Sequence, residues 1–122
     1  MATVTLARFR ELLARATGSY IAGTVDSGST TTVVDATTKG SISQYDTRRL
    51  VNHWLYIVTD AGSAAPEGEA RRITSVSSNT ITVTVVFTAA TASGDTYEVL
   101  PFHPLDMNDA IQEAIRLVYP DL

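Results

Sequence analysis

The stretch from Ser75 to Gly94 has the most regular pattern in the chain and restricts the fold more than any other segment. Branched or aromatic residues alternate there with threonines: Ile81, Val83, Val85 and Phe87 against Thr80, Thr82 and Thr84. Because successive side chains of a strand point to opposite faces, such a run has one apolar face and one hydroxyl face. The pattern predicts a half-buried strand in a domain built around a small sheet.

Length and composition indicate one folded domain. The chain has 122 residues, of which 44% are hydrophobic and 18% charged, as expected for a globular protein with one core. The net charge is -4 and Lys39 is the only lysine. This disfavours a general nucleic-acid surface, because phosphate binding needs clustered basic side chains, so any DNA contact would come from a local arginine patch.

Other classes of protein are disfavoured by what the sequence lacks. Cysteine is absent, which excludes disulfides, thiolate metal sites and cysteine nucleophiles. Residues 1–16 carry three arginines and no signal-type apolar run, and no stretch of about 18 apolar residues occurs anywhere. We therefore expect a soluble protein without an export signal and without a membrane partner.

Helical spacing of apolar residues occurs near both ends of the chain. At the amino terminus it predicts a helix over about 5–16. The expected apolar stripe is Leu6, Phe9, Leu13 and Ala16, widened by Leu12, with Arg8, Arg10, Glu11 and Arg15 on the other faces. Towards the carboxyl terminus it predicts a helix over about 104–119. Its expected stripe is Ile111, Ala114, Ile115 and Val118.

About six short strands are predicted between these helices. In chain order they are a hairpin over 21–35 that turns at 26–29, a strand covered on both faces at 54–59, a hairpin joining 69–76 to 80–88, and a last strand at 96–100. Residues 60–68 have the composition of a loop, and residues 45–52 are expected to form one helical turn.

Together these elements predict a mainly β, α+β fold. It consists of a small antiparallel β-barrel of about six short strands with one helix at each end. The chain 1–122 is expected to be a single domain, with an N-terminal helix over 1–18, the barrel over 20–101 and a C-terminal helix over 103–120.

The sequence shows no reaction centre. Its two histidines, His53 and His103, lack the spacing of a metal-ligand pair, and neither a phosphate-binding glycine loop nor a GxSxG motif occurs. We therefore expect no catalytic residues, no metal, no cofactor and no enzymatic activity. A small hydrolase or nuclease accessory is the alternative, and it requires a histidine within hydrogen-bond reach of a carboxylate.

The densest group of charges comprises Glu67, Glu69, Arg71 and Arg72. In a strand, Glu69 and Arg71 share one face while Arg72 points to the other. Ion pairs on a solvated rim are the simpler interpretation. The alternative is a contact with a neighbouring subunit, where a guanidinium group can bind a carboxylate through two hydrogen bonds.

Three aromatic residues, Trp54, Tyr56 and Tyr97, could form a binding platform. Base stacking on such a platform normally comes with basic side chains that neutralise phosphates. Few basic residues accompany these three, so packing in the core or at a subunit interface is the favoured interpretation.

Several segments resemble a module of structural proteins from tailed bacteriophages. In chain order they are residues 29–35, Trp54-Leu55-Tyr56-Ile57, Gly68-Glu69-Ala70-Arg71-Arg72-Ile73-Thr74, the strand 80–87, Ser93-Gly94-Asp95-Thr96-Tyr97-Glu98-Val99, and the helix containing Asn108-Asp109-Ala110-Ile111. In that module a small β-barrel is wrapped from such strands and a closing helix often accompanies it. The resemblance covers most of residues 24–119, although residues 39–49 have no counterpart.

The resemblance implies a non-enzymatic virion component, assembled in the bacterial host cytoplasm, that works in many copies. The leading interpretation is a head-to-tail connector or neck protein that forms a homo-oligomeric ring and contacts portal, neck or tail proteins. DNA would pass through the ring without sequence-specific binding, which an acidic protein suits. The alternative is a host-surface-binding module of a tail fibre or baseplate that uses exposed aromatics such as Trp54 or Tyr97.

The residues expected at interfaces come from the charged strand edge and the last helix. They are Glu67, Glu69, Arg71, Arg72, Ile111, Ile115 and Arg116. The loop 60–68 is expected to contribute to the same subunit contacts.

Overall fold

The structure is a computed structural model that describes residues 5–17, 20–36 and 50–118. These ranges contain two helices and seven strands: α1 (Leu6–Thr17), β1 (Ile21–Thr24), β2 (Ser27–Gly28), β3 (Thr32–Val34), β4 (Trp54–Thr59), β5 (Ala70–Ser77), β6 (Thr80–Val83), β7 (Thr96–Leu100) and α3 (Pro104–Val118). The strands form one antiparallel sheet in the order β1-β7-β4-β5-β6-β3-β2. The predicted mainly β fold with a helix near each end of the chain is confirmed.

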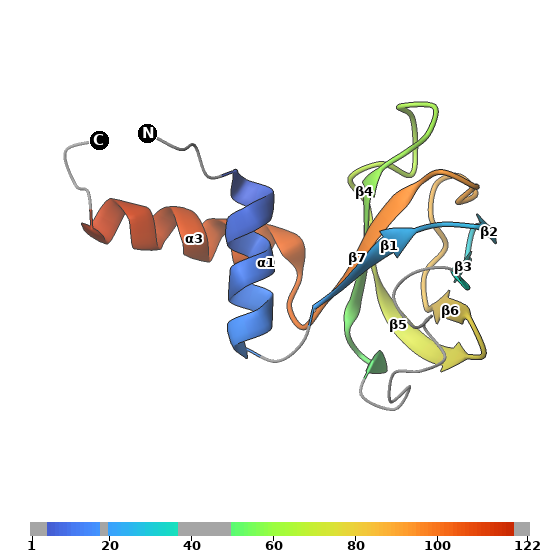
Figure 1. Ribbon diagram of the computed structural model, residues 1–122, viewed down its shortest axis with the longest axis horizontal. Coiled ribbons are helices and arrows are strands. Elements are labelled where there is room, and N and C mark those ends of the chain that lie inside the picture. Colours follow the sequence, from blue (N-terminus) through green and yellow to red (C-terminus); the bar gives the residue numbers. More distant parts are fainter. Residues whose placement is uncertain (1–4, 18–19, 37–49, 119–122) are drawn as a thin grey trace.

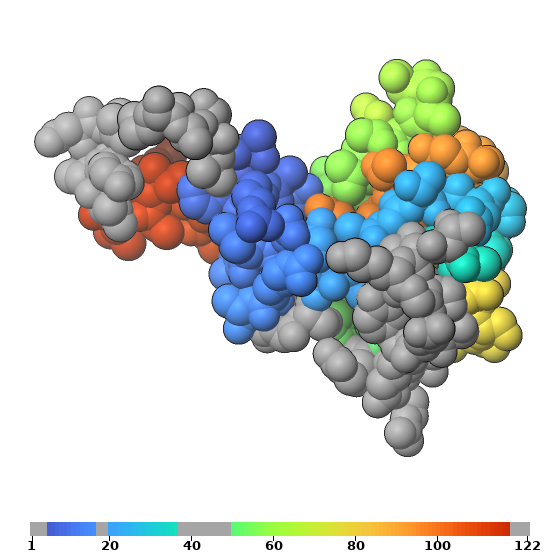
Figure 2. Space-filling model, viewed as in Figure 1, coloured from blue at the N-terminus to red at the C-terminus, as the bar shows by residue number. Residues whose placement is uncertain are grey.

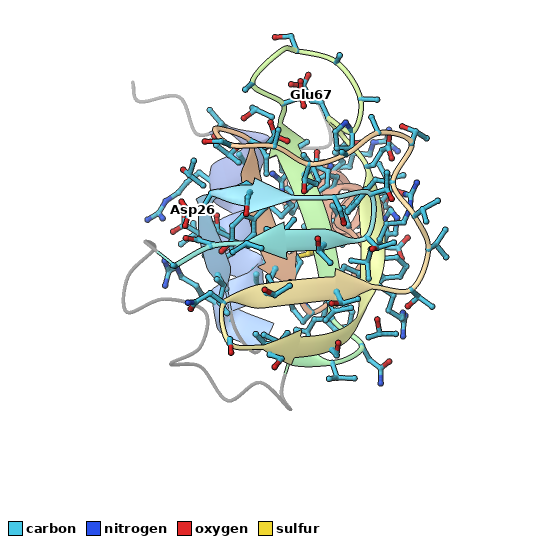
Figure 3. All side chains as sticks on the ribbon, turned by 90° about the vertical axis from the view of Figure 1, so that its right-hand side faces the viewer. Asp26 and Glu67 are labelled. Carbon is cyan, nitrogen blue, oxygen red and sulfur yellow. The ribbon has the colours of Figure 1, made fainter. Side chains whose placement is uncertain are left out.

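The predicted small β-barrel is wrong in that the sheet is not closed, because in the described ranges the edge strands β1 and β2 do not pair with each other. The two edge strands follow each other in the chain, and the backbone between them passes from one edge to the other. The Val25 amide donates to the Asp95 carbonyl oxygen at 2.7 Å, and the next amide, of Asp26, donates to the Val34 carbonyl oxygen at 2.8 Å. The sheet therefore bends around its core without a ladder that closes it, and β4 runs across the direction of β3 and β6 (Figure 3).

The prediction of one hairpin over residues 21–35 is wrong, because its first strand pairs with another part of the chain. β1 pairs with β7, whereas β2 occupies the positions expected for the turn and pairs with β3. Gly28 in β2 has a specific reason: a Cβ there would lie 2.6 Å from the Thr32 carbonyl oxygen and would overlap the Thr91 side chain. The supposed turn is therefore an edge strand that lies close to a neighbouring loop.

The strands β4, β5 and β7 lie where the pattern predicts them, but β6 ends early, at Val83. The amide and hydroxyl of Thr84 both donate to the Arg72 carbonyl oxygen, at 3.0 and 3.1 Å, and the chain leaves the sheet there. Val85, expected on the apolar face, is consequently 59% exposed, while Phe87 returns to the core. The segment 60–68 is a loop as predicted, and most of the predicted helical turn 45–52 lies outside the described residues.

Two hydrophobic clusters lie on opposite sides of β7. The larger one fills the inside of the bent sheet, and its residues are Ile21, Val25, Val33, Leu50, Leu55, Ile57, Ile73, Val76, Ile81, Val83, Phe87, Tyr97 and Val99. The smaller one contains Ala14, Leu100 and Met107, with Leu13, Tyr20 and Tyr56 packed against it. It joins the sheet to α1 and α3, which cross each other on one side of the sheet (Figure 1).

Both helices have the predicted bounds to within about a residue, but α1 turns a different face inward from the one expected, and the stripe predicted for α3 is wrong at Ala114. On α1, Arg10 and Ala14 are the buried residues, whereas Leu12 is 45% exposed. On α3, Met107 and Ile111 are buried and Ala114 is exposed. The apolar stripe predicted for α1 is thus wrong at Leu6, Leu12 and Ala16, which all lie at the surface.

We predict that Ile57→Ala lowers the free energy of unfolding by about 2–5 kcal/mol, because Ile57 is fully buried and the truncation leaves a cavity. Val85→Ala is the matched control, since Val85 is a branched residue largely in solvent, and its effect should stay within about 0.5 kcal/mol. Urea unfolding followed by circular dichroism measures both. Equal effects of the two substitutions would contradict the described core.

Candidate interaction surface on the helix pair

A buried ion pair attaches α1 to the sheet. Arg10 Nε donates to Glu98 Oε1 at 2.8 Å, and both side chains are at least nine-tenths buried. The second oxygen of Glu98 accepts from the Tyr20 hydroxyl at 2.8 Å, and Arg10 Nη1 donates to Asn108 Oδ1 on α3 at 3.4 Å. The Arg10 guanidinium also lies 5.1 Å from the centre of the Tyr56 ring. Four elements and the segment before β1 therefore meet at one polar cluster.

Strand alternation explains why Glu98 can serve this cluster. Its neighbours Tyr97 and Val99 point into the main core, so Glu98 and Leu100 point towards the helices. Burial and the hydrogen bond to the Glu98 carboxylate raise the pKa of Tyr20 far above its ordinary value. Tyr20 is therefore a neutral hydrogen-bond donor to Glu98 at neutral pH.

The orientation of Arg10 determines which residues α1 presents to solvent. Arg8, Leu12 and Arg15 follow one another at intervals of four and three residues, so they share the face opposite Arg10. Arg8 and Arg15 both bind the Glu11 carboxylate, at 2.9 and 3.0 Å, yet their side chains remain 54% and 56% exposed. The hydrogen bond from Arg8, then that from Arg15, and the charges of both arginines lower the pKa of Glu11. The exposed face of α1 is therefore a leucine between two arginines.

The exposed face of α3 has the opposite charge. Asp106, Ala110 and Glu113 are exposed at the same four- and three-residue intervals, and Leu117 follows four residues later. Beside them an apolar groove of about 300 Å³ lies between the helices, lined by Leu13, Phe102, Asp106, Met107 and Ala110. Phe102, Leu105 and Leu117 are all more than half exposed. Phe102 lines the groove, and exposed apolar side chains beside such a groove are typical of interaction sites.

Two of the predicted interface residues, Glu69 and Arg71, bind within their own chain. Arg71 Nη2 donates to Glu69 Oε1 at 3.1 Å and its Nε donates to the Val86 carbonyl oxygen at 3.1 Å. Glu69 also accepts hydrogen bonds from the Thr88 amide, at 3.0 Å, and from the Thr88 hydroxyl. Burial acts to raise the pKa of Glu69, but the Thr88 hydrogen bonds and the Arg71 charge outweigh it and lower the pKa. These two residues tie the start of β5 to the segment after β6.

Arg72 and Glu67 point away from that pair. The Arg72 guanidinium lies 4.8 Å from the centre of the Trp54 ring, whose other contact is an edge-on packing with His103 at 4.6 Å. Glu67 Oε1 accepts from the Asp60 amide at 2.9 Å, within the loop that projects beyond the sheet (Figure 3). Both residues are exposed, and their contact with a neighbouring subunit stays a prediction.

The three predicted residues on α3 differ in exposure. Ile111 is buried against the smaller core and Ile115 is half-buried, while the Arg116 side chain is 78% exposed and lies 3.9 Å from Glu113. Ile111 therefore holds the helix in place, and only Arg116 of the three is fully open to a partner. The sequence pattern did not indicate that Leu12 lies at the surface. One signal was present in the sequence: an acidic residue inside the apolar run Tyr97-Glu98-Val99 suggests a buried basic partner such as Arg10.

The described residues contain no arrangement typical of an active site. Neither histidine forms a hydrogen bond or ion pair with a carboxylate there, and His103 Nδ1 accepts from the Leu105 amide at 3.1 Å, at the start of α3. No group of three His, Asp or Glu side chains in the same ranges could hold a metal ion. Neither described helix combines the length and the apolar character that crossing a membrane requires.

The aromatic residues proposed as a binding platform are separated by the sheet. Tyr97 is buried and its hydroxyl donates to Asp35 Oδ2 at 2.6 Å, whereas Trp54 is half-buried between Arg72 and His103.

No family model, curated protein or solved structure matches this chain. Its function therefore has to be inferred from its own surfaces.

We predict that Arg10→Met lowers the free energy of unfolding by about 3–5 kcal/mol, because it leaves the Glu98 carboxylate buried without its charge partner. Adding Glu98→Gln should recover most of this loss, since the neutral amide oxygen still accepts from Tyr20. Arg8→Met is the matched control on the same helix and should cost at most about 1 kcal/mol. Urea unfolding measures all three variants. Similar losses for Arg8→Met and Arg10→Met would refute the role of the Arg10–Glu98 ion pair in attaching α1 to the sheet.

The lowered pKa of Glu69 predicts a specific acid sensitivity. Its contribution to stability is complete above the ordinary carboxyl pKa of 4.5 and is lost as the pH falls through the lower value of the folded state. Glu69→Gln should therefore destabilise the protein at neutral pH and make the further loss below pH 4.5 less steep. Unfolding curves over this range, with Glu113→Gln as an exposed control, test this, and parallel curves for native chain and Glu69→Gln would contradict it.

Proposed function

We propose that this chain is a non-enzymatic structural component of a tailed-bacteriophage virion. Its place is the head-to-tail connector or neck, where it assembles as a homo-oligomeric ring. The observation that carries the proposal is the helix pair. A buried ion pair and the smaller hydrophobic cluster hold α1 and α3 on the sheet, and yet both helices present charged and apolar residues outward.

The arrangement suits a building block better than a catalyst. A subunit of a ring needs one rigid body with two separate contact surfaces, and the sheet and the helix pair supply such a body. The sequence resemblance to phage virion modules supports the same function, and the segments that carry it overlap β3, β4, β5, β6, β7 and α3.

The net charge of the protein supports a position on the DNA passage. At a net charge of -4, with a single lysine, the chain offers little that would bind phosphates firmly. A ring through which DNA is ejected must let the duplex slide, and an acidic lining favours this. The ring would be joined to portal, neck or tail proteins of the same particle.

The tail-fibre alternative receives less support from the aromatic residues. A sugar- or host-binding face needs aromatic rings in solvent, whereas Tyr97 is buried and Trp54 is partly covered. The exposed apolar residues lie mainly at the helix pair, and an apolar helix surface favours a protein partner over a sugar.

Deleting the gene from the phage that encodes it distinguishes these functions. For a connector we expect DNA-filled heads and separate tails that do not join, as seen by electron microscopy, and restoration by the native chain supplied in trans. For a tail-fibre module, complete particles that fail to adsorb would appear instead. Mass spectrometry of purified particles is the second measurement, and a chain absent from the particle would refute a virion role altogether.

A further inference from the structure

The outer face of α1 and the outer face of α3 match each other in spacing and are opposite in charge. On α1 the order is Arg8, Leu12, Arg15, and on α3 it is Asp106, Ala110, Glu113. In both, a charged residue, an apolar residue and a second charged residue follow at intervals of four and then three positions, which places each set on one helix face. Each charge on one face therefore has an opposite charge at the corresponding position of the other.

The apolar residues of the two faces also differ in size in a complementary way. Leu12 is a large side chain that is 45% exposed, whereas Ala110 is small and lines the groove of about 300 Å³ with Phe102 and Met107. A leucine projecting from one helix fits a groove over an alanine of another, as in ordinary packing of ridges into grooves. In the space-filling view the outer side of α1 is open between α3 and the sheet (Figure 2).

We infer that α1 of one copy binds the α3 groove of the next copy. Leu12 enters the groove beside Ala110, and Arg8 and Arg15 face Asp106 and Glu113 of the neighbour. The inference rests on the proposed assembly of identical subunits and names the surfaces that carry it. Because the two faces are different parts of one chain, each copy uses α1 towards one neighbour and α3 towards the other, an arrangement that closes into a ring when its rotation permits.

The local ion pairs of both faces are compatible with this contact. Arg8 and Arg15 share one carboxylate, Glu11, so the face of α1 keeps a surplus of positive charge. Glu113 lies 3.9 Å from Arg116, a separation at which an exposed pair contributes little. Asp106 and Asp109 add negative charge on α3. A guanidinium can also bind a second carboxylate through its remaining donors.

Mixing two single-cysteine variants tests the contact directly, since the native chain contains no cysteine. One variant carries Leu12→Cys and the other Ala110→Cys. Under mild oxidation we expect the mixed disulfide between the two chains to form at least about tenfold faster than in a control mixture of Leu12→Cys with Val85→Cys, because Val85 is exposed in the segment after β6, outside both helix faces. Equal rates in the two mixtures would overturn the inference. All three positions are exposed, so the fold should be retained, which circular dichroism verifies.

Charge reversal across the two chains tests the ion pairs in the same assay. Arg8→Glu with Arg15→Glu on the Leu12→Cys chain should slow the mixed disulfide about tenfold. Asp106→Arg with Glu113→Arg on the Ala110→Cys chain should then restore it. A reversal that has no effect, or a restoration that fails while both chains stay folded, contradicts the proposed register.

The outcome also separates this inference from the proposed function. If the native chain assembles into rings that the charge reversals leave intact, subunits meet through other surfaces and only the helix contact is refuted. If the mixed disulfide forms as expected but the chain is absent from virions, the helix contact stands and the virion role is refuted.

Discussion

The ion pair between Arg10 and Glu98 is the constraint on which the arrangement of this protein depends. Two charges taken out of water are tolerated only when they are paired and their remaining hydrogen-bonding groups are satisfied. Tyr20 and Asn108 supply those bonds from two other parts of the chain. The pair therefore fixes how far α1 is rotated about its axis and ties it to α3 and to β7 at the same time.

The sheet makes this possible because β7 serves two cores. Alternation sends Tyr97 and Val99 into the bent sheet and Glu98 and Leu100 towards the helices. The same strand is paired on both sides, with β1 and β4, so it is held firmly in place. The helix pair is thus attached to a strand with a partner on each side, and its outer surface keeps a defined position relative to the sheet.

Local patterns in the sequence predicted the elements well but not how they face one another. The helices, β4, β5 and β7 follow from periodicity and turn residues, which act over a few positions. The edge strand at Gly28, the early end of β6 at Val83 and the inward turn of Arg10 depend on partners far away in the chain. For the same reason, periodicity placed Leu12 in the core, whereas the ion pair of Arg10 with Glu98 turns α1 so that Leu12 lies at the surface.

That exposure of Leu12 has a physical cost that assembly would explain. A helix rotated to bury Leu12 would gain apolar burial, but it would return Arg10 to water and leave the Glu98 carboxylate buried without its charge partner, which costs more. That rotation is therefore unfavourable for the single chain, whereas a chain with apolar residues in place of both charges could be at least as stable. The ion pair does select one orientation of α1 over its alternatives, and this orientation places Leu12 between Arg8 and Arg15 on the open face. We interpret the buried charges as giving up some apolar burial within the chain and keeping Leu12 available for the neighbouring copy that we propose.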